Sequence, residues 1–478
     1  MSELLPFSYA QTHGVLSTDG ELLHKPGINY QVIAELQRHF GGEPLTLVEI
    51  PEADFKQRLK DVYHDDSDAA QQAVADMDLS QLVDDIPEEG DLLAGNNDAP
   101  VIRLINAILA QALKAKASDI HLEPCEDRVA VRFRVDGVLN EVLQAKAQLA
   151  PLINSRIKVM ARLDIAEKRL PQDGRMSVTL AGHTIDIRVS TLPSAYGERA
   201  VLRILDQAAG ALKLHQLQMP TKTHNAFAGA LKKPHGIILV TGPTGSGKTT
   251  SLYAGLTEIN DRSRNIMTIE DPVEYLLPGI AQTQVNAKAT MTFVRGLRAI
   301  LRQDPDVVMI GEIRDGETAS IAVQSSLTGH LVLSTLHTNT AIGAVTRLLD
   351  MGVEAFLLSS SLDLIMAQRL VRRLCECKQP HKPSPAECEQ LGFEPEVEIF
   401  SAKGCDLCGN TGYRGRLGIY EHIVIDEQMR QLIHEGAGEQ TMLAYARQFS
   451  PSILDAGKAR IIAGETSVEE VLRVTTLS

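Results

Sequence analysis

Residues 236–250 of the 478-residue chain read Gly-Ile-Ile-Leu-Val-Thr-Gly-Pro-Thr-Gly-Ser-Gly-Lys-Thr-Thr. The apolar run 237–240 predicts a buried strand, and the glycine-rich segment after it matches the P-loop pattern at every fixed position. Glycines let several backbone N–H groups face one anionic pocket, and the helix that starts near Lys248 adds its positive end. The stretch therefore predicts a binding site for a nucleoside triphosphate.

Each part of this loop has an expected role. Lys248 can reach the β- and γ-phosphates of ATP, and the Thr249 hydroxyl can bind Mg²⁺. The alternative is a glycine-rich turn without a ligand, which the order strand, loop, Lys-Thr and helix disfavours. The predicted ATP-binding residues are Gly242, Pro243, Thr244, Gly245, Ser246, Gly247, Lys248, Thr249 and Thr250.

The composition describes a soluble globular protein of about three domains. Hydrophobic residues make up 44% and charged residues 23% of the chain, and the formal net charge is −14. A general nucleic-acid binder needs the opposite sign of charge, so no nucleic-acid partner is expected. The chain has no run of 18 apolar residues and no secretory signal at its first residues, so a cytoplasmic location is expected.

Changes in pattern along the chain predict the domain boundaries. Residues 1–75 predict a small domain that can serve for docking, and the acidic, poorly periodic residues 76–98 predict a linker. Residues 99–211 predict an α+β domain with helices at 101–113 and 149–166. Its predicted strands are 129–137, 176–180, 184–189 and 200–205. Residues 212–478 alternate strands and helices, which predicts an α/β fold with a parallel sheet and helices on both faces.

Polar residues follow three further strands of this last domain, predicted at 265–269, 307–310 and 331–336. Since parallel strands end at one edge of a sheet, we expect these residues to meet the P-loop there. The second strand ends in Gly311-Glu312, whereas the commonest Walker B motif ends in Asp-Glu. Glu312 therefore faces the metal, and we expect Glu274 or Asp271 to supply the second carboxylate and orient water.

Three other interpretations of these strand ends stay open. The segment 270–274 can cap a turn at Pro272 and carry no chemistry. His337 can sense the γ-phosphate, or it is a structural residue, as is expected for His330. Because Gly311 removes one carboxylate, a regulatory protein that binds a nucleotide but hydrolyses it slowly is also possible.

Four cysteines predict a structural zinc site. They form two pairs around a segment rich in proline and charge, and four thiolates suit a closed zinc site. One residue separates the first pair instead of the usual two, so His381 or Cys388 can replace one thiolate. Reduced cysteines in an exposed loop are the alternative. The predicted zinc ligands are Cys375, Cys377, Cys405 and Cys408.

Several motifs together resemble the secretion ATPase (traffic ATPase) superfamily of type II secretion and type IV pilus machines. Three of them lie before the P-loop: SDIHLEP, RLPQDGR and DIRVST. The others are GPTGSGKTT, TIEDPVE, LRQDPDVVMIGEIRD and TGHLVLSTLHTN. The resemblance covers about residues 100–478. It implies a hexameric ring in which a PAS-like domain and a RecA-like domain hold ATP with Mg²⁺ between them.

The resemblance also implies roles for individual residues. Glu274 resembles the glutamate that orients water, and Glu312 the glutamate on the Mg²⁺ side. The segment 330–337 resembles the family's "His box", which ends at His337. Arg188 and Arg203 resemble the arginines that the upstream domain sends to the phosphates, and Arg298 and Arg302 resemble residues that line the domain interface.

The short N-terminal region is similar to that of the type II secretion (general secretory pathway) branch. This resemblance implies docking on the cytoplasmic part of an inner-membrane platform protein, so that the chain is peripheral to the membrane. Its implied activity is ATP hydrolysis that drives pseudopilus assembly and protein export. The alternative in the same superfamily is type IV pilus assembly, whose ATPases usually carry a longer N-terminal region.

Overall fold

The structure is a computed structural model that describes residues 98–180, 183–205, 212–286 and 289–475, with parts of the segment 13–58. The chain divides into two compact units, Met1–Asp206 and Gln207–Ser478. Almost all of the predicted acidic linker, 76–98, lies outside the described residues, and so do Leu4, Leu5 and Phe7 at the start of the predicted docking domain. The finer domain boundaries stay a prediction.

A small sheet forms the described part of the N-terminal region. Strand β1 pairs antiparallel with β2, and β2 pairs parallel with β3. Neighbouring residues of a strand face opposite sides, so Leu16 and Leu23 pack with Phe55 while Val15 and Leu22 pack on the other side. The strands are β1 (Val15–Thr18), β2 (Glu21–His24) and β3 (Thr46–Glu49).

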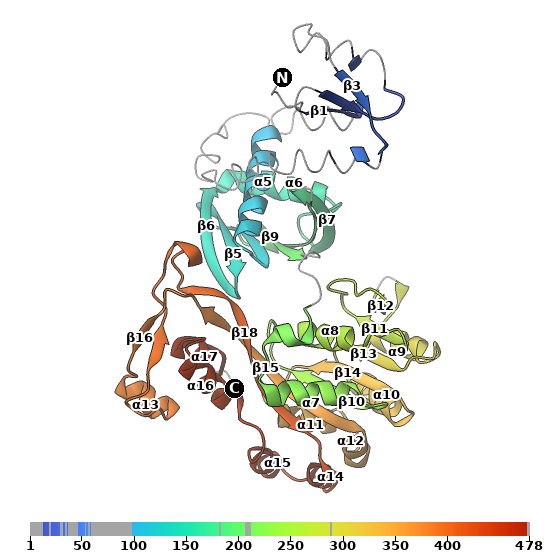
Figure 1. The fold of residues 1–478 in the computed structure, drawn as a ribbon, viewed down its shortest axis with the longest axis vertical. Helices are drawn as coiled ribbons and strands as arrows, with labels where there is room; N and C mark the ends of the chain where they lie inside the picture. Colours follow the sequence, from blue (N-terminus) through green and yellow to red (C-terminus); the bar gives the residue numbers. More distant parts are fainter. Residues whose placement is uncertain are drawn as a thin grey trace. The chain divides into compact units, whose positions relative to one another are not determined.

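A six-stranded antiparallel sheet, in the order β6-β5-β4-β9-β8-β7, forms the rest of the first unit. Helices α5 and α6 pack on one face of this sheet and share its apolar core (Figure 1). The sequence motif SDIHLEP is strand β4, which sequence reasoning had not assigned to any element. The elements are α5 (Asp98–Lys114), β4 (Asp119–Pro124), β5 (Arg128–Val135), β6 (Val138–Lys146), α6 (Ala150–Met160), β7 (Gln172–Leu180), β8 (His183–Ser194) and β9 (Gly197–Leu205).

The predicted helix at 149–166 is too long, because α6 ends at Met160. Arg162 has φ 58°, in the left-handed region. The N–H of Leu163 donates to the Lys158 carbonyl at 2.8 Å and that of Arg162 to the Val159 carbonyl at 3.1 Å. These two bonds form a Schellman motif, which satisfies the last carbonyls and turns the chain away from the helix.

A seven-stranded sheet, in the order β12-β11-β13-β14-β10-β15-β18, forms the centre of the second unit. All of its neighbouring strands are parallel except β18, which runs antiparallel to β15 at one edge. The predicted parallel sheet is confirmed with this edge strand added. The strands are β10 (Gly236–Thr241), β11 (Ile266–Glu270), β12 (Ala281–Gln284), β13 (Val307–Ile310), β14 (Leu331–Leu336), β15 (Leu362–Leu374) and β18 (Tyr413–Val424).

Helices cover both faces of this sheet, as the alternating pattern predicts (Figure 1). In β10, Ile237 and Leu239 pack in one core, and Ile238 and Val240 pack in the other. The first core contains residues of α9 (Phe293–Ile300), α10 (Gly316–Leu327), α11 (Ala341–Asp350) and α12 (Ala355–Ser361). The second contains α7 (Thr221–Leu231) and α8 (Lys248–Ile259).

The cysteine-bearing insertion follows β15 and precedes β18. It contains β16 (Gln379–His381), α13 (Pro385–Leu391) and β17 (Ile399–Ser401), and β16 pairs antiparallel with β17. Four helices complete the second unit: α14 (Glu427–His434), α15 (Glu439–Ala446), α16 (Ile453–Ile462) and α17 (Val468–Thr475).

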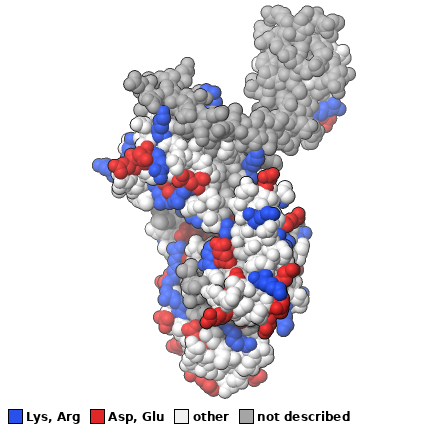
Figure 2. All heavy atoms as spheres, turned by 90° about the vertical axis from the view of Figure 1, so that its left-hand side faces the viewer, with Lys and Arg blue, Asp and Glu red and all other residues white. Residues whose placement is uncertain are grey.

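Lysines and arginines are interspersed with aspartates and glutamates on the face drawn in Figure 2. The described residues of that face form no continuous basic field of the kind that a nucleic-acid groove presents. Among the described helices, none has the length and apolar content that a membrane crossing requires.

Candidate nucleotide site and cysteine cluster

The P-loop connects strand β10, which lies between β14 and β15 in the sheet, to helix α8. Three of its glycines have positive φ, 150° at Gly242, 80° at Gly245 and 85° at Gly247. A Cβ at Gly242 would lie 2.5 Å from the carbonyl oxygen of Gln368, and one at Gly247 would lie 2.8 Å from the Gln368 side chain. Glycine is therefore required both by the backbone turn and by close packing on β15.

Lys248 begins α8 and points back into the loop. Its Nζ donates to the carbonyl oxygens of Gly242 at 2.7 Å and of Pro243 at 3.1 Å. Burial lowers the pKa of Lys248 to about 8, although the charge of Glu312 acts to raise it. The ammonium group is thus held among loop carbonyls, beside the positive end of α8.

The buried hydroxyl of Ser246 has no hydrogen-bond partner among the described residues. Pro243, Thr244 and Gly245 form the exposed tip of the loop, and Thr249 is half-buried in the first turn of α8. An unpaired buried hydroxyl beside a lysine and a helix N-terminus fits the binding of a phosphate group. These residues also fit Mg²⁺, because the Thr249 hydroxyl is the oxygen ligand that a P-loop offers.

Gly311, at the Walker B position, lies against the neighbouring strand β11. A Cβ there would lie 3.3 Å from both the Glu270 Cα and the Ile269 carbonyl oxygen. Its N–H donates to that carbonyl at 2.8 Å. A side chain at this position therefore needs the β11 backbone to shift by a few tenths of an ångström, so glycine is the residue that packs here without such a shift.

The carboxylate of Glu312 contacts two side chains, those of Arg314 and His337. It forms an ion pair with Arg314, and its Oε2 lies 3.4 Å from Nε2 of His337. Burial and the nearby charge of Lys248 lower the pKa of His337, so its ring is neutral at pH 7. The structure therefore brings together Lys248, Glu312 and His337, as the sequence predicted from the strand ends.

Glu270 is buried at the end of β11, within a hydrogen-bond network. The sequence alone did not distinguish this glutamate from the other acidic residues of the segment 270–274. It accepts hydrogen bonds from Tyr253, from Thr268, and from Gln282 at 3.2 Å. Burial raises the pKa of Glu270, and the charge of Glu274 raises it further. Glu274 itself is half-buried beside this network. The predicted site residue thus lies next to a second, buried carboxyl group.

Two residues of β15 support the P-loop and carry no motif that could have revealed them. Gln368 accepts a hydrogen bond from the Ser251 hydroxyl at 2.7 Å, and it is the residue against which Gly242 and Gly247 pack. Arg369 is buried and donates to the Asn339 carbonyl at 3.0 Å. Burial lowers the pKa of Arg369.

The two histidines of the predicted His box lie at opposite ends of β14. His337 follows the strand at the P-loop edge, whereas His330 precedes it. The Nδ1 of His330 lies 2.8 Å from the carbonyl oxygen of Ser325 near the end of α10. This contact is compatible with the structural role expected for His330 from the sequence, which stays a prediction.

Three of the four predicted arginines lie on β8, β9 and α9, and Arg302 lies in the turn that follows α9. Arg188 of β8 and Arg203 of β9 are direct cross-strand partners in the first unit. In the second unit, Arg298 pairs with Glu317 at 2.9 Å, and Arg302 donates to the Arg298 carbonyl at 2.8 Å.

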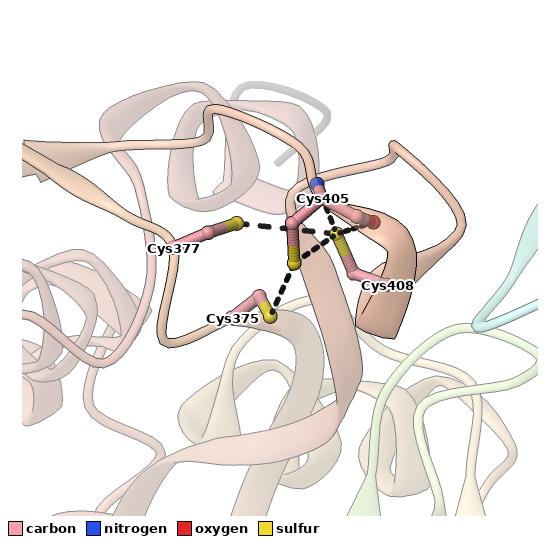
Figure 3. Close-up of side chains that lie close together, drawn as sticks. All are labelled: Cys375, Cys377, Cys405 and Cys408. Carbon is pink, nitrogen blue, oxygen red and sulfur yellow. Dashed lines mark hydrogen bonds between the residues drawn. The ribbon is translucent and has the colours of Figure 1, made fainter.

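Figure 3 shows the four predicted zinc ligands pointing toward one another. Their Sγ atoms all lie within 4.8 Å of one another. Three of the separations are 3.8 Å for Cys375 and Cys405, 4.0 Å for Cys377 and Cys408, and 3.7 Å for Cys405 and Cys408. A tetrahedral zinc ion with bonds of about 2.3 Å requires sulfur atoms about 3.8 Å apart, so the cluster fits zinc.

The environment of Cys408 favours a thiolate. Its Sγ lies 3.2 Å from the N–H groups of both Cys405 and Gly412. Burial acts to raise the pKa of Cys408, but these two N–H groups lower it below its usual range. His381 and Cys388, the alternative ligands, are not part of the metal-ligand group found in the described residues.

The family model described as "Type II/IV secretion system protein" matches residues 94–473. A second model, for an N-terminal domain of "GSPII protein E", matches residues 4–63. The two matches together cover most of the chain, and the second one falls on the predicted docking domain.

Curated relatives match over almost the whole chain. "Type II secretion system protein E" of Pseudomonas aeruginosa is 59% identical over 98% of this chain and 96% of its own length. "Type II secretion system ATPase E" of Vibrio cholerae is 51% identical over 98% and 96%. Among solved structures, the pilus retraction motor PilT with bound ADP has a TM-score of 0.53 and 25% identity, covering 77% of this chain and 95% of PilT. These matches confirm the predicted resemblance and the RecA-like fold.

Proposed function

Because the chain belongs to the type II/IV secretion system protein family, we propose that it hydrolyses ATP to power protein export by a type II secretion system. One observation carries this proposal: Lys248, Glu312 and His337 meet beside a P-loop at the carboxyl edge of a parallel sheet. Each of these side chains can interact with the γ-phosphoryl group or the ion that accompanies it.

We assign a role in hydrolysis to each residue of the site. Lys248 and the loop N–H groups bind the phosphates, and Thr249 and Glu312 hold the side of the site that Mg²⁺ occupies. Glu274 orients the attacking water, and Arg188 and Arg203 of the first unit neutralise the charge that develops on the phosphoryl oxygens. When it is bound, Mg²⁺ would neutralise part of the negative charge of the phosphates.

The N-terminal match supports a docking role for residues 4–63. We propose that this domain binds the cytoplasmic part of an inner-membrane platform protein, which places the chain peripherally at that membrane. We also propose that the chain works as a homo-hexamer. We propose that Arg188 and Arg203 act on the phosphates in this assembly, and that ATP hydrolysis drives pseudopilus assembly.

The cysteine cluster has a structural role in this proposal. Four thiolates leave no open position for a substrate, so zinc would hold the insertion together and take no part in hydrolysis. The cluster ties the chain between β15 and β16 to the chain before β18.

The decisive experiment measures the ATPase rate per protomer against protein concentration, with Lys248→Ala as the comparison. A rate that rises faster than linearly with protein concentration, and that disappears in the variant, supports a motor that is active only when its subunits assemble. A rate that is linear or absent while nucleotide still binds favours the slow regulatory switch that Gly311 suggests.

Glu274→Gln and Glu312→Gln test the two-carboxylate mechanism, which fails if neither substitution changes turnover. Complementation of secretion, compared with complementation of pilus assembly, separates the two machines. The N-terminal domain match and the 59% identity favour secretion.

A further inference from the structure

One face of the six-stranded sheet carries a row of charged residues that crosses five strands. In β4, Ile120 and Leu122 belong to the apolar core, so Asp119 points to the opposite face. The same alternation holds in the neighbouring strands, whose core residues include Phe133, Leu202 and Ile187. In strand order from β5 to β7, the cross-strand partners in the row are Arg134, Asp119, Arg203, Arg188 and Arg175.

Asp119 is the buried member of this row. Its side chain is 7% exposed, whereas that of Arg203 is 55% exposed. Oδ1 of Asp119 accepts a hydrogen bond from Nε of Arg203 at 2.9 Å, and Oδ2 lies 3.6 Å from Nε of Arg134. The Ser118 hydroxyl donates to the same Oδ2 at 2.8 Å. The carboxylate is therefore fixed by the sheet and holds one arginine on each side.

The rest of the row is cationic. Arg203 and Arg188 lie directly opposite each other, and so do Arg188 and Arg175. Like charges in direct cross-strand opposition destabilise a sheet, and an anion placed above them relieves this repulsion. Arg188 also forms a long ion pair, 3.9 Å, with Asp173. Four of the five residues of the row are arginines, so this face of the sheet carries positive charge that can attract an anion.

We propose that Asp119 is a positioning residue that holds the Arg203 guanidinium in the orientation in which it meets the phosphates of ATP. This inference rests on the proposed function, because it assigns Asp119 a role through an arginine that we place at the phosphates. A guanidinium donates hydrogen bonds in one plane, so a carboxylate that holds Nε fixes the direction of the remaining N–H groups.

Glu123 provides a matched control on the same strand and the same face. It also pairs with two arginines, Arg132 at 2.6 Å and Arg199 at 2.6 Å. Burial raises the pKa of Glu123, but the hydrogen bond from Arg132 and the charge of Arg199 lower it overall, so the carboxylate is ionised. Glu123 thus repeats the local chemistry of Asp119 with a different pair of arginines.

The test is a double-mutant cycle on the full chain, with kcat and KM for ATP as the readouts. We expect Asp119→Asn to lower kcat about ten- to a hundredfold with little change in KM, because a misplaced charge mainly affects the transition state. We expect Arg203→Ala to lower kcat at least as much. The double variant should match Arg203→Ala alone, because Asp119 acts through Arg203. Glu123→Gln should keep kcat within about twofold of the wild type.

Two results would overturn the inference: effects of Asp119→Asn and Arg203→Ala that multiply, or a loss of kcat in Glu123→Gln as large as in Asp119→Asn. If Asp119→Asn does not fold, Asp119→Glu completes the same cycle, since it keeps the charge but moves the carboxylate. A wild-type chain that hydrolyses no ATP at any concentration would refute the proposed function instead, so the two failures are distinguishable.

Discussion

Nε2 of His337 lies 3.4 Å from Oε2 of Glu312, although the two residues come from the ends of different strands. The contact exists because β13 and β14 are parallel neighbours, so that Ile310 and Ser334 are aligned and the residues after each strand meet. Burial, and to a smaller extent the nearby charge of Lys248, lowers the pKa of His337, which favours its neutral ring. A neutral imidazole can hold the Glu312 carboxylate without adding a charge to the site.

His337→Ala should lower ATP turnover about ten- to a hundredfold while ATP binding changes little, because Glu312 loses a partner that fixes its position. The measurements are steady-state ATPase rates and nucleotide titrations. His330→Ala is the control at the other end of β14, and its rate per folded protomer should equal that of the wild type. Equal losses in both variants would contradict a specific role for His337.

Gly311→Asp should destabilise the second unit by about 1–3 kcal/mol and should not raise ATP turnover. It recreates the commonest Walker B sequence, but its Cβ would lie 3.3 Å from the β11 backbone at Ile269 and Glu270. Urea unfolding and ATPase rates measure the two effects, and Gly311→Ala separates the steric effect from that of the charge. A Gly311→Asp variant that is as stable as the wild type and hydrolyses ATP faster would show that the β11 backbone can shift at little cost in free energy.

Zinc content should be about one ion per chain, and Cys405→Ser should abolish it, because the ligand geometry needs all four thiolates. Cys388→Ser is the control, since this thiol is outside the cluster. Elemental analysis and the thermal midpoint of unfolding are the readouts, and removal of zinc by a chelator should lower the midpoint. Loss of zinc from Cys388→Ser would instead show that Cys388 is one of the zinc ligands.

The sequence predicted those parts of the fold that depend on local pattern. The strands around the P-loop are continuous apolar runs because both of their faces are buried, so their positions agree with the structure within one residue. Glycine spacing and strand ends also predicted which side chains meet there. These features require no knowledge of distant contacts.

Other features depend on contacts between residues far apart in the sequence. Helix α6 stops at Met160, and the buried Lys158 near its end forms an ion pair with Glu198 of strand β9. In β15, the polar residues Gln368 and Arg369 are buried against the P-loop and Asn339. Local pattern does not show such partners, so this supporting layer of the site could not be predicted.

Glu470 in α17 should make the attachment of that helix depend on pH. Its buried carboxylate accepts hydrogen bonds from Arg372 of β15 at 2.7 Å and from Arg473 at 2.8 Å. Burial acts to raise the pKa of Glu470, but the bonds from Arg473 and Arg372 lower it to about 2. Because the carboxyl binds its proton more weakly in the folded state, its contribution to stability is complete above about pH 5 and is lost as the pH falls toward 2.

A pKa lowered from 4.5 to about 2 corresponds to a contribution of about 3 kcal/mol. The protection factors of the α17 amides against hydrogen exchange should therefore fall as the pH is lowered from 5 to 3, before the whole chain unfolds. Glu470→Gln should exchange rapidly at pH 7 and lose this pH dependence, whereas Glu469→Gln, a change at the exposed neighbour, should behave as the wild type does. Equal pH dependence in all three proteins would mean that another group controls the release of α17.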